Sequence, residues 1–125
     1  MKPFILLTAV TSLVLSASDC SNNTRSKEKY KGRLEIKGIC MNYTISLVEG
    51  TMDTSGFAAN WTDEVTKKSY KNVFALGSPC NFPATIKEGD EFYFSIDTTT
   101  VQNCAVCMAY YPTPPKKLAI KVVEN

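Results

Sequence analysis

The sequence predicts an all-β protein, a small antiparallel sandwich or barrel of about six or seven strands with disulfides. Short apolar or alternating segments recur at roughly ten-residue spacing, separated by turns that contain glycine, proline or polar residues. No helical periodicity of useful length follows the N-terminal segment. Four of the five cysteines fall inside this strand-rich region, where they offer two cross-links.

The N-terminal segment, residues 1–18, is predicted to be a signal peptide. Lys2 supplies a positive charge, residues 4–15 form a largely apolar run, and three small residues follow. This arrangement is typical of an export signal, and the run is too short to span a bilayer comfortably. We therefore expect an exported chain without a membrane span, because no later stretch is apolar enough to form one.

Residues 19–29 are polar and are expected to form a flexible leader or a lipoprotein tether. Cys20 ends a stretch that resembles a bacterial lipobox, which makes it a candidate for lipidation, although Asp19 departs from the small residue of that pattern. Cleavage after Ser18 by an ordinary signal peptidase is the alternative. Without Cys20 the cysteine count becomes an even four, and residues 30–125 remain as a single β domain.

The first half of this domain changes its hydrophobic parity at Gly38. Apolar residues occupy even positions before this glycine and odd positions after it. A two-residue hairpin would produce the change and would pair Ile36 with Ile39 and Leu34 with Met41. A β-bulge at Gly38 within one long strand is the alternative.

Further strands are expected over residues 57–61, 70–76, 91–97 and 118–122, each bounded by turn residues. The clearest is the stretch over 91–97, where aromatic or aliphatic residues alternate with polar ones.

Residues 104–111 are apolar at even and at odd positions alike, and three prolines follow within the next four residues. A strand covered on both faces has this pattern, and proline cannot continue a hydrogen-bonded ladder. The pattern therefore predicts the central strand of the domain, ending at Tyr111. The expected core is Leu34, Ile36, Ile39, Met41, Ile45, Leu47, Phe74, Leu76, Phe92, Phe94, Ile96, Val106, Leu118, Ile120 and Val122.

In an exported chain, Cys40, Cys80, Cys104 and Cys107 are expected to form two disulfides. Positions i and i+3 of an extended strand lie about 10 Å apart, beyond disulfide reach. We therefore favour bonds from Cys104 and Cys107 to Cys40 and Cys80, in either pairing. If Cys104 belongs to a turn, a local Cys104–Cys107 bond with Cys40–Cys80 remains open. A four-cysteine zinc site is disfavoured by the oxidising compartment, so no metal is expected.

Composition gives no support for catalysis or for nucleic acid as a partner. The chain has no histidine and a net charge of +2, so the commonest general base is missing and no basic field favours nucleic acid. The acidic pairs Asp63 with Glu64 and Asp90 with Glu91 lie at predicted turns, where solvated charge explains them. We therefore expect a protein that is not an enzyme, with no catalytic residues and no cofactor.

Aromatic side chains are the remaining candidates for a functional surface. Tyr93, Tyr110, Tyr111 and Trp61 are predicted to form a binding surface for a protein or a glycan of the cell envelope. Consecutive tyrosines at a strand end point to opposite faces, so Tyr110 and Tyr111 cannot both enter one core. The alternative is that Trp61 and Tyr111 are core residues.

Residues 38–40, 70–74, 89–92 and 102–112 resemble a small exported domain of unknown function found in bacteria of the Bacteroidetes type. The resemblance covers nearly the whole mature chain and implies no activity. The expected strand order is also similar to oligonucleotide/oligosaccharide-binding and netrin-like barrels, which is a likeness of fold alone.

The leading hypothesis is thus an exported, non-catalytic β domain that serves as a binding or structural module, either secreted, periplasmic or lipid-anchored at the cell envelope. A secreted enzyme inhibitor or immunity-type protein is the second hypothesis. The third is a thiol oxidoreductase that uses Cys104 and Cys107.

Overall fold

A computed structural model of the chain describes residues 28–98 and 104–124, and residues 1–27, 99–103 and 125 lie outside it. The expected signal peptide, Cys20 and most of the leader are therefore not described. No helix within the described ranges is long and apolar enough to cross a membrane.

The described residues form seven strands and three short 3₁₀ turns, which confirms the all-β fold with disulfides. The predicted strands over 57–61, 70–76 and 91–97 are confirmed to within one or two residues. The elements are β1 (Tyr30–Lys37), η1 (Ile39–Met41), β2 (Tyr43–Glu49), η2 (Thr54–Gly56), β3 (Ala58–Thr62), β4 (Ser69–Leu76), η3 (Pro79–Asn81), β5 (Glu91–Ile96), β6 (Lys117–Leu118) and β7 (Ile120–Val123).

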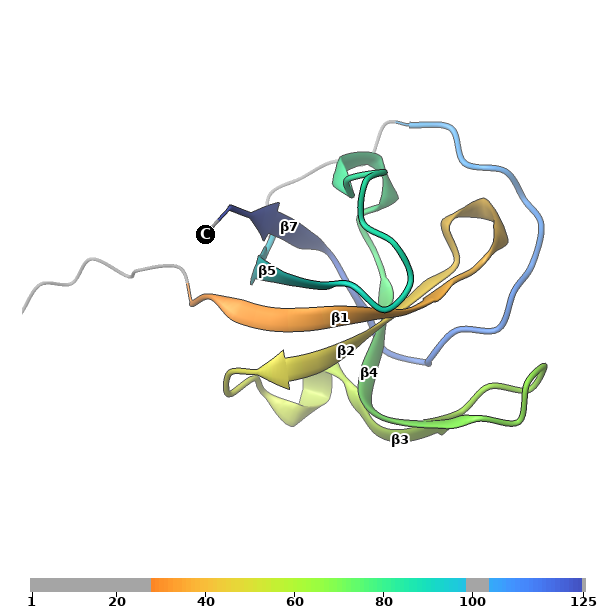
Figure 1. Cartoon of the computed structure of the whole chain (residues 1–125), viewed down its shortest axis with the longest axis horizontal. Helices are drawn as coiled ribbons and strands as arrows, with labels where there is room; N and C mark the ends of the chain where they lie inside the picture. Colours follow the sequence, from red (N-terminus) through yellow and green to blue (C-terminus); the bar gives the residue numbers. More distant parts are fainter. Residues whose placement is uncertain (1–27, 99–103, 125) are drawn as a thin grey trace, which may run out of the picture.

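All seven strands belong to one sheet, in which β3, β4, β2, β1, β5 and β7 follow one another as antiparallel neighbours (Figure 1). β6 lies off this path and pairs in parallel with β4. Only Ala119 separates β6 from β7, so the C-terminal segment reaches both β4 and β5. The strand path therefore curves back toward itself, although no continuous ladder closes the sheet within the part of the chain that the structure describes.

The C-terminal segment packs closely against the end of β4. The Gly77 amide donates to the Leu118 carbonyl at 2.6 Å, and a Cβ on Gly77 would lie 2.9 Å from the Leu118 carbonyl carbon. Only glycine permits this approach. The buried Ser78 hydroxyl both accepts from the Ile120 amide and donates to the Ile120 carbonyl, each at 2.8 Å.

The β1–β2 connection is a hairpin, but its loop is longer than predicted. Leu34 pairs with Ile45, and Ile36 pairs with Thr44, so the predicted pairs with Met41 and Ile39 are wrong. η1 fills the loop, and Cys40 and Met41 take left-handed backbone conformations, with φ of 57° and 60°. A register shift between Leu34 and Ile36 shows that an irregularity does occur, inside β1 and not at Gly38.

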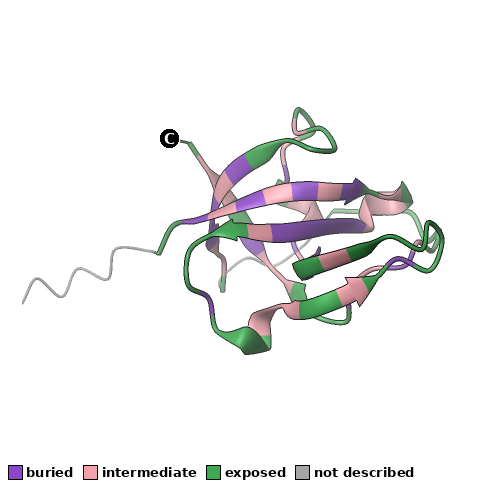
Figure 2. Cartoon of the chain, turned by 60° about the horizontal axis from the view of Figure 1, so that its bottom comes forward, coloured by how far each residue is buried: buried purple, intermediate pink, exposed green. Residues whose placement is uncertain are grey.

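The hydrophobic core lies on the central strands, where Figure 2 shows the buried residues concentrated. Phe74 and Phe94 are fully buried, with ring centroids 5.7 Å apart. Of the predicted core, Ile39 and Val106 are wrong, because they are 58% and 42% exposed. The sequence interpretation missed buried Tyr30, Tyr43, Met52 and Phe82.

The predicted central strand over residues 104–111 is also wrong. These residues form no strand, and those from Cys104 to Tyr110 are exposed. The centre of the sheet is instead formed by β2 and β1. The segment is apolar at even and at odd positions, yet its residues from Cys104 to Tyr110 are exposed, so this pattern did not indicate a strand covered on both faces.

Candidate functional site

The strap, defined as residues 104–115, is the segment on which the candidate functional site is built. Figure 1 shows it as a blue tube that arcs around the outside of the sheet before the chain enters β6. It makes no strand, yet it is held to the sheet at several separate points. These points decide which of its side chains face solvent.

Two disulfides attach the first part of the strap. Cys104 bonds to Cys80 of η3, with the Cα atoms 5.4 Å apart, and Cys107 bonds to Cys40 of η1, at 5.0 Å. This confirms the predicted long-range links and their choice over a local Cys104–Cys107 bond. Two disulfides indicate an oxidising, extracytoplasmic environment.

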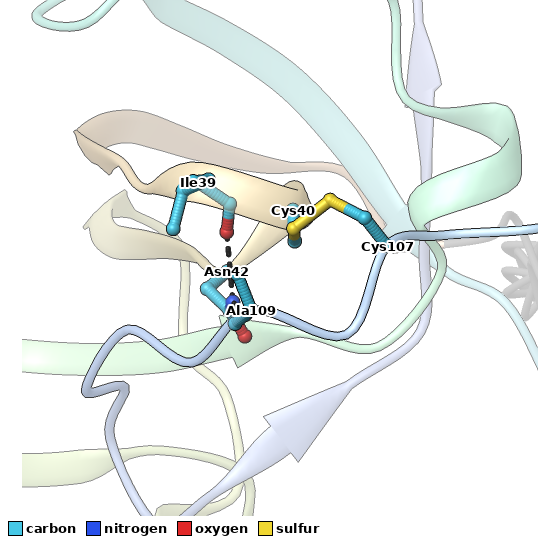
Figure 3. Close-up of a disulfide and its surroundings, with 5 residues drawn as sticks. All are labelled: Ile39, Cys40, Asn42, Cys107 and Ala109. Atoms are coloured by element: carbon cyan, nitrogen blue, oxygen red, sulfur yellow. Dashed lines mark hydrogen bonds between the residues drawn. A yellow bond between two sulfur atoms is a disulfide. The ribbon is translucent and has the colours of Figure 1, made fainter.

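Asn42 provides a third attachment on the same turn as Cys40 (Figure 3). Its side-chain amide donates to the Ile39 carbonyl at 2.7 Å and to the Ala109 carbonyl at 2.9 Å. The strap is thus held by a covalent bond at residue 107 and by a hydrogen bond at residue 109. The residue between these two attachments is Met108.

The buried carboxylate of Asp63 holds the second half of the strap. Its Oδ2 accepts the Tyr111 hydroxyl at 2.9 Å and the Thr66 hydroxyl at 3.0 Å, while Oδ1 accepts the Val65 amide at 2.9 Å. The side chain of Asp63 is 0% exposed, so its prediction as a solvated turn charge is wrong. Its exposed neighbour Glu64 does not share this environment.

The pKa of Asp63 follows from a balance of two effects. Burial opposes ionisation, but the hydrogen bonds from the Val65 amide, the Tyr111 hydroxyl and Thr66 outweigh it, so the pKa is lowered. The hydrogen bond between the Tyr111 hydroxyl and Asp63, together with some desolvation and the charge of this carboxylate, raises the pKa of Tyr111. Asp63 is therefore a charged structural anchor that joins the β3–β4 turn to the strap.

The two consecutive tyrosines have different environments. Tyr110 is 80% exposed. Tyr111 is partly buried, and its ring lies so close to Gly38 that a Cβ there would be 3.2 Å from two ring carbons. Pro112 and Pro114, which follow it in the chain, are buried. The hydrogen bond to Asp63 and the packing against Gly38 therefore hold Tyr111, whereas Tyr110 is exposed to solvent.

Exposed apolar side chains concentrate around the strap. Among the described residues, six large hydrophobic side chains are exposed, and five of them lie on the strap or on the two turns that hold it. The sixth, Val48, is on β2. Met108 is the most exposed, at 94%. We call these five residues the strap face: Ile39, Val65, Val106, Met108 and Tyr110.

A cavity of about 340 Å³ lies between the strap, η1 and the end of β4. The disulfide residues Cys40, Cys80 and Cys104 line it, together with Val106 and Lys117 among others. Among the described residues that line the cavity, Lys117 is the only ionisable group. Within the described ranges, no three histidine, cysteine or acidic side chains gather where they could hold a metal ion.

The other predicted site residues lie elsewhere. Trp61 on β3 is half-buried and stacks on Tyr70, with ring centroids 6.0 Å apart. Tyr93 on β5 lies beneath the ammonium groups of Lys29 and Lys31. Three strands separate β3 from β5 along the sheet. The four predicted residues therefore do not form one aromatic surface. Tyr110 and Tyr111 lie on the strap, whereas Trp61 and Tyr93 lie on separate strands of the sheet.

The structural contacts of the acidic pair Asp90 and Glu91 account for both residues without a functional site. Asp90 accepts a hydrogen bond from the Lys87 amide within a turn, and Glu91 forms surface ion pairs with Arg33 and Lys31, which lower the pKa of Glu91.

Sequence reasoning missed Met108, Ile39 and Val65 as members of an exposed apolar surface. The two cysteines and three prolines around Met108 were the available signal, because they mark a segment held by cross-links and not by a ladder.

No family model, curated protein or solved structure matches this chain. The resemblance to exported Bacteroidetes-type domains stays a prediction.

Proposed function

We propose that this protein is an exported, non-catalytic binding module that recognises a partner protein through the strap face. The observation that carries the proposal is the concentration of exposed apolar side chains, five of the six on described residues, around one cross-linked segment. Exposed apolar side chains gathered on one segment and on the turns that hold it favour an interaction site in a soluble protein.

A protein suits the strap face better than a glycan. Met108, Val106 and Ile39 offer no polar group to a sugar hydroxyl, and Tyr110 is the only aromatic among the five. Exposed methionine and tyrosine are side chains that protein interfaces favour. The disulfides, Asn42 and Asp63 already order the strap in the free protein, which reduces the entropy lost on binding.

The proposed location is outside the cytoplasm. The predicted signal peptide over residues 1–18 supports export, and Cys20 offers a lipid anchor at the cell envelope as the alternative to a secreted or periplasmic protein. Mass spectrometry of the native N-terminus separates these locations. A diacylglyceryl-modified Cys20 indicates the anchor, and an N-terminus at Asp19 indicates a secreted or periplasmic protein.

The enzyme-inhibitor hypothesis gains support from Met108, which projects from the strap between two attachments to one turn. The thiol oxidoreductase hypothesis loses support, because Cys104 and Cys107 bond to different partners and are not a dithiol pair.

The test compares charged substitutions at matched exposed positions. Extracellular and envelope proteins are captured on immobilised wild-type protein, on Met108→Glu with Tyr110→Glu, and on Val48→Glu as the control. We expect the same protein on the wild type and on the control, and its loss from the strap variant by at least about tenfold. Equal retention by all three proteins would refute the strap face as the binding surface.

A further inference from the structure

We propose that the strap is an inhibitory loop for an endopeptidase with an apolar specificity pocket, and that Met108–Ala109 is the bond presented to its active site. This inference rests on the proposed function and names the class of partner. Protease–inhibitor complexes depend on a preorganised segment that binds as a substrate does.

Accessibility singles out this bond. An endopeptidase must take several residues of an exposed, non-helical segment into its cleft, and every residue from Cys104 to Tyr110 is exposed and outside any strand or helix. Met108 is the most exposed large apolar side chain among the described residues. Its unbranched, flexible thioether chain is suited to an apolar pocket. The small Ala109 after it puts no bulk beside the bond.

Both ends of the bond are attached to the same short turn. On one side, the Cys107–Cys40 disulfide fixes the chain to η1. On the other side, the Ala109 carbonyl accepts the side-chain amide of Asn42, which directly follows η1 (Figure 3). If the bond were cut, neither new end would be released. The amine of Ala109 would stay close to the acyl group of Met108 at a high effective concentration.

The outer attachments hold the loop as a whole. Cys104–Cys80 fixes its beginning, and the Tyr111–Asp63 hydrogen bond with buried Pro112 fixes its end. The loop is therefore ordered before it meets an enzyme, and the cost of ordering it on binding is small. The same attachments resist the departure of the two halves after cleavage.

The chemistry is that of a reversible acyl transfer. The protease serine oxygen attacks the Met108 carbonyl carbon, and the serine proton passes through the protease histidine to the Ala109 nitrogen as that bond breaks. This gives a Met108 ester on the enzyme and a free Ala109 amine. Because the amine stays in place, it attacks the ester and restores both the peptide bond and the serine. Hydrolysis by water, which would give the Met108 carboxylate and the Ala109 amine, is slow by comparison.

The first experiment measures inhibition of chymotrypsin, whose specificity pocket is apolar, and of trypsin, whose pocket is anionic. The mature disulfide-bonded protein should inhibit chymotrypsin with an inhibition constant below about 1 μM and should not inhibit trypsin. Met108→Lys should exchange the two specificities. Val48→Lys adds the same charge at an exposed valine on β2 and should behave as the wild type.

The second experiment tests the hydrogen bond between the Asn42 side chain and the Ala109 carbonyl. Asn42→Ala removes the side-chain hydrogen bonds to Ala109 and to Ile39 and leaves both disulfides in place. With chymotrypsin, mass spectrometry should show cleavage of this variant after Met108 at a rate at least about tenfold above that of the wild type. A thermal melt of each variant confirms that it is folded before it is assayed.

Two results would overturn the inference. One is the absence of inhibition by the wild type on chymotrypsin together with its absence for Met108→Lys on trypsin. The other is rapid and complete cleavage of the wild type after Met108, which would make the strap an ordinary substrate. Either result leaves the proposed binding function intact if the Met108→Glu, Tyr110→Glu variant still loses its captured protein. If that variant keeps the protein, the binding function itself fails.

Discussion

β5 and the strap are similarly apolar in sequence, but the apolar side chains of β5 enter the core and most of those of the strap are exposed. Phe92 and Phe94 of β5 are buried, whereas Met108 and Tyr110 of the strap project into solvent. β5 has a hydrogen-bonded neighbour on each side, β1 and β7. The strap has no ladder and is held by disulfides and side-chain hydrogen bonds. Apolar composition therefore did not decide burial, and backbone pairing together with the cross-links did.

The comparison also separates two sources of stability. The sheet gains its free energy of folding from apolar area removed from water. The strap gains little from burial, and its cross-links act by restricting the unfolded chain. Substitutions in the two regions should consequently differ in how much they lower the free energy of unfolding and in which part of the protein they disturb.

The largest effect is expected for Phe94→Ala, in the region held by burial. Phe94 is fully buried and lies near Tyr30, Phe74 and Phe92. Truncation should lower the free energy of unfolding by about 3–5 kcal/mol through lost transfer energy and the cavity left behind. Urea denaturation of the oxidised protein measures it. A loss below about 1 kcal/mol would mean that the aromatic cluster does not carry the core.

The next effect concerns the disulfides of the strap. Replacing Cys40 and Cys107 together by alanine, or Cys80 and Cys104 together, should each cost about 2–4 kcal/mol. The first pair closes a separation of 67 residues and the second one of 24. The loop-entropy model then predicts that loss of the first pair costs about 1 kcal/mol more. Denaturation of both double variants tests the order, and the reverse order would contradict the entropic account.

Asp63→Ala should cost about 1–3 kcal/mol, because it leaves the Val65 amide and the hydroxyls of Thr66 and Tyr111 without their acceptor. Hydrogen exchange should increase in the β3–β4 turn more than in β5. Glu64→Ala is the matched control at the exposed neighbouring position, and it should change stability by no more than about 0.5 kcal/mol.

Asp63 should also make stability depend on pH. Its folded pKa lies below the usual value near 3.8. A carboxyl with a lowered folded pKa contributes stability above its unfolded pKa, and this contribution is lost as the pH falls through the folded pKa. The difference in unfolding free energy between wild type and Asp63→Asn should therefore shrink on acidification from pH 5 through about 3.8 and below. A difference that is constant over this range would show that the carboxylate charge is not stabilising.

The smallest effects are expected at the tip of the strap. Tyr110→Ala and Met108→Ala should change the free energy of unfolding by no more than about 0.5 kcal/mol, since both side chains are exposed. Tyr111→Ala should destabilise the protein more than Tyr110→Ala, because it removes the contact with Gly38 and the bond to Asp63. Thermal melts of the three variants compare them directly.

Much of the sheet was predictable from the sequence. The alternation of Phe92, Phe94 and Ile96 with polar neighbours predicted β5 and its inward face, and similar patterns predicted β3 and β4. Side-chain alternation along a strand is a local property, so a short window contains the information. The extended reach between positions 104 and 107 likewise favoured long-range disulfides, even though that segment proved not to be a strand.

Only the tertiary structure decided which apolar segment enters the core and which acidic group is buried. Residues 104–111 satisfy the pattern of a covered strand, but the sites beside β1 and β2 are taken by β5 and β4. Asp63 belongs to a polar turn, and its burial depends on Tyr111, which lies 48 residues further along the chain. Met108 projects because Cys40 and Asn42 hold the chain on either side of it. Each of these outcomes depends on partners distant in sequence, which no local pattern of residues encodes.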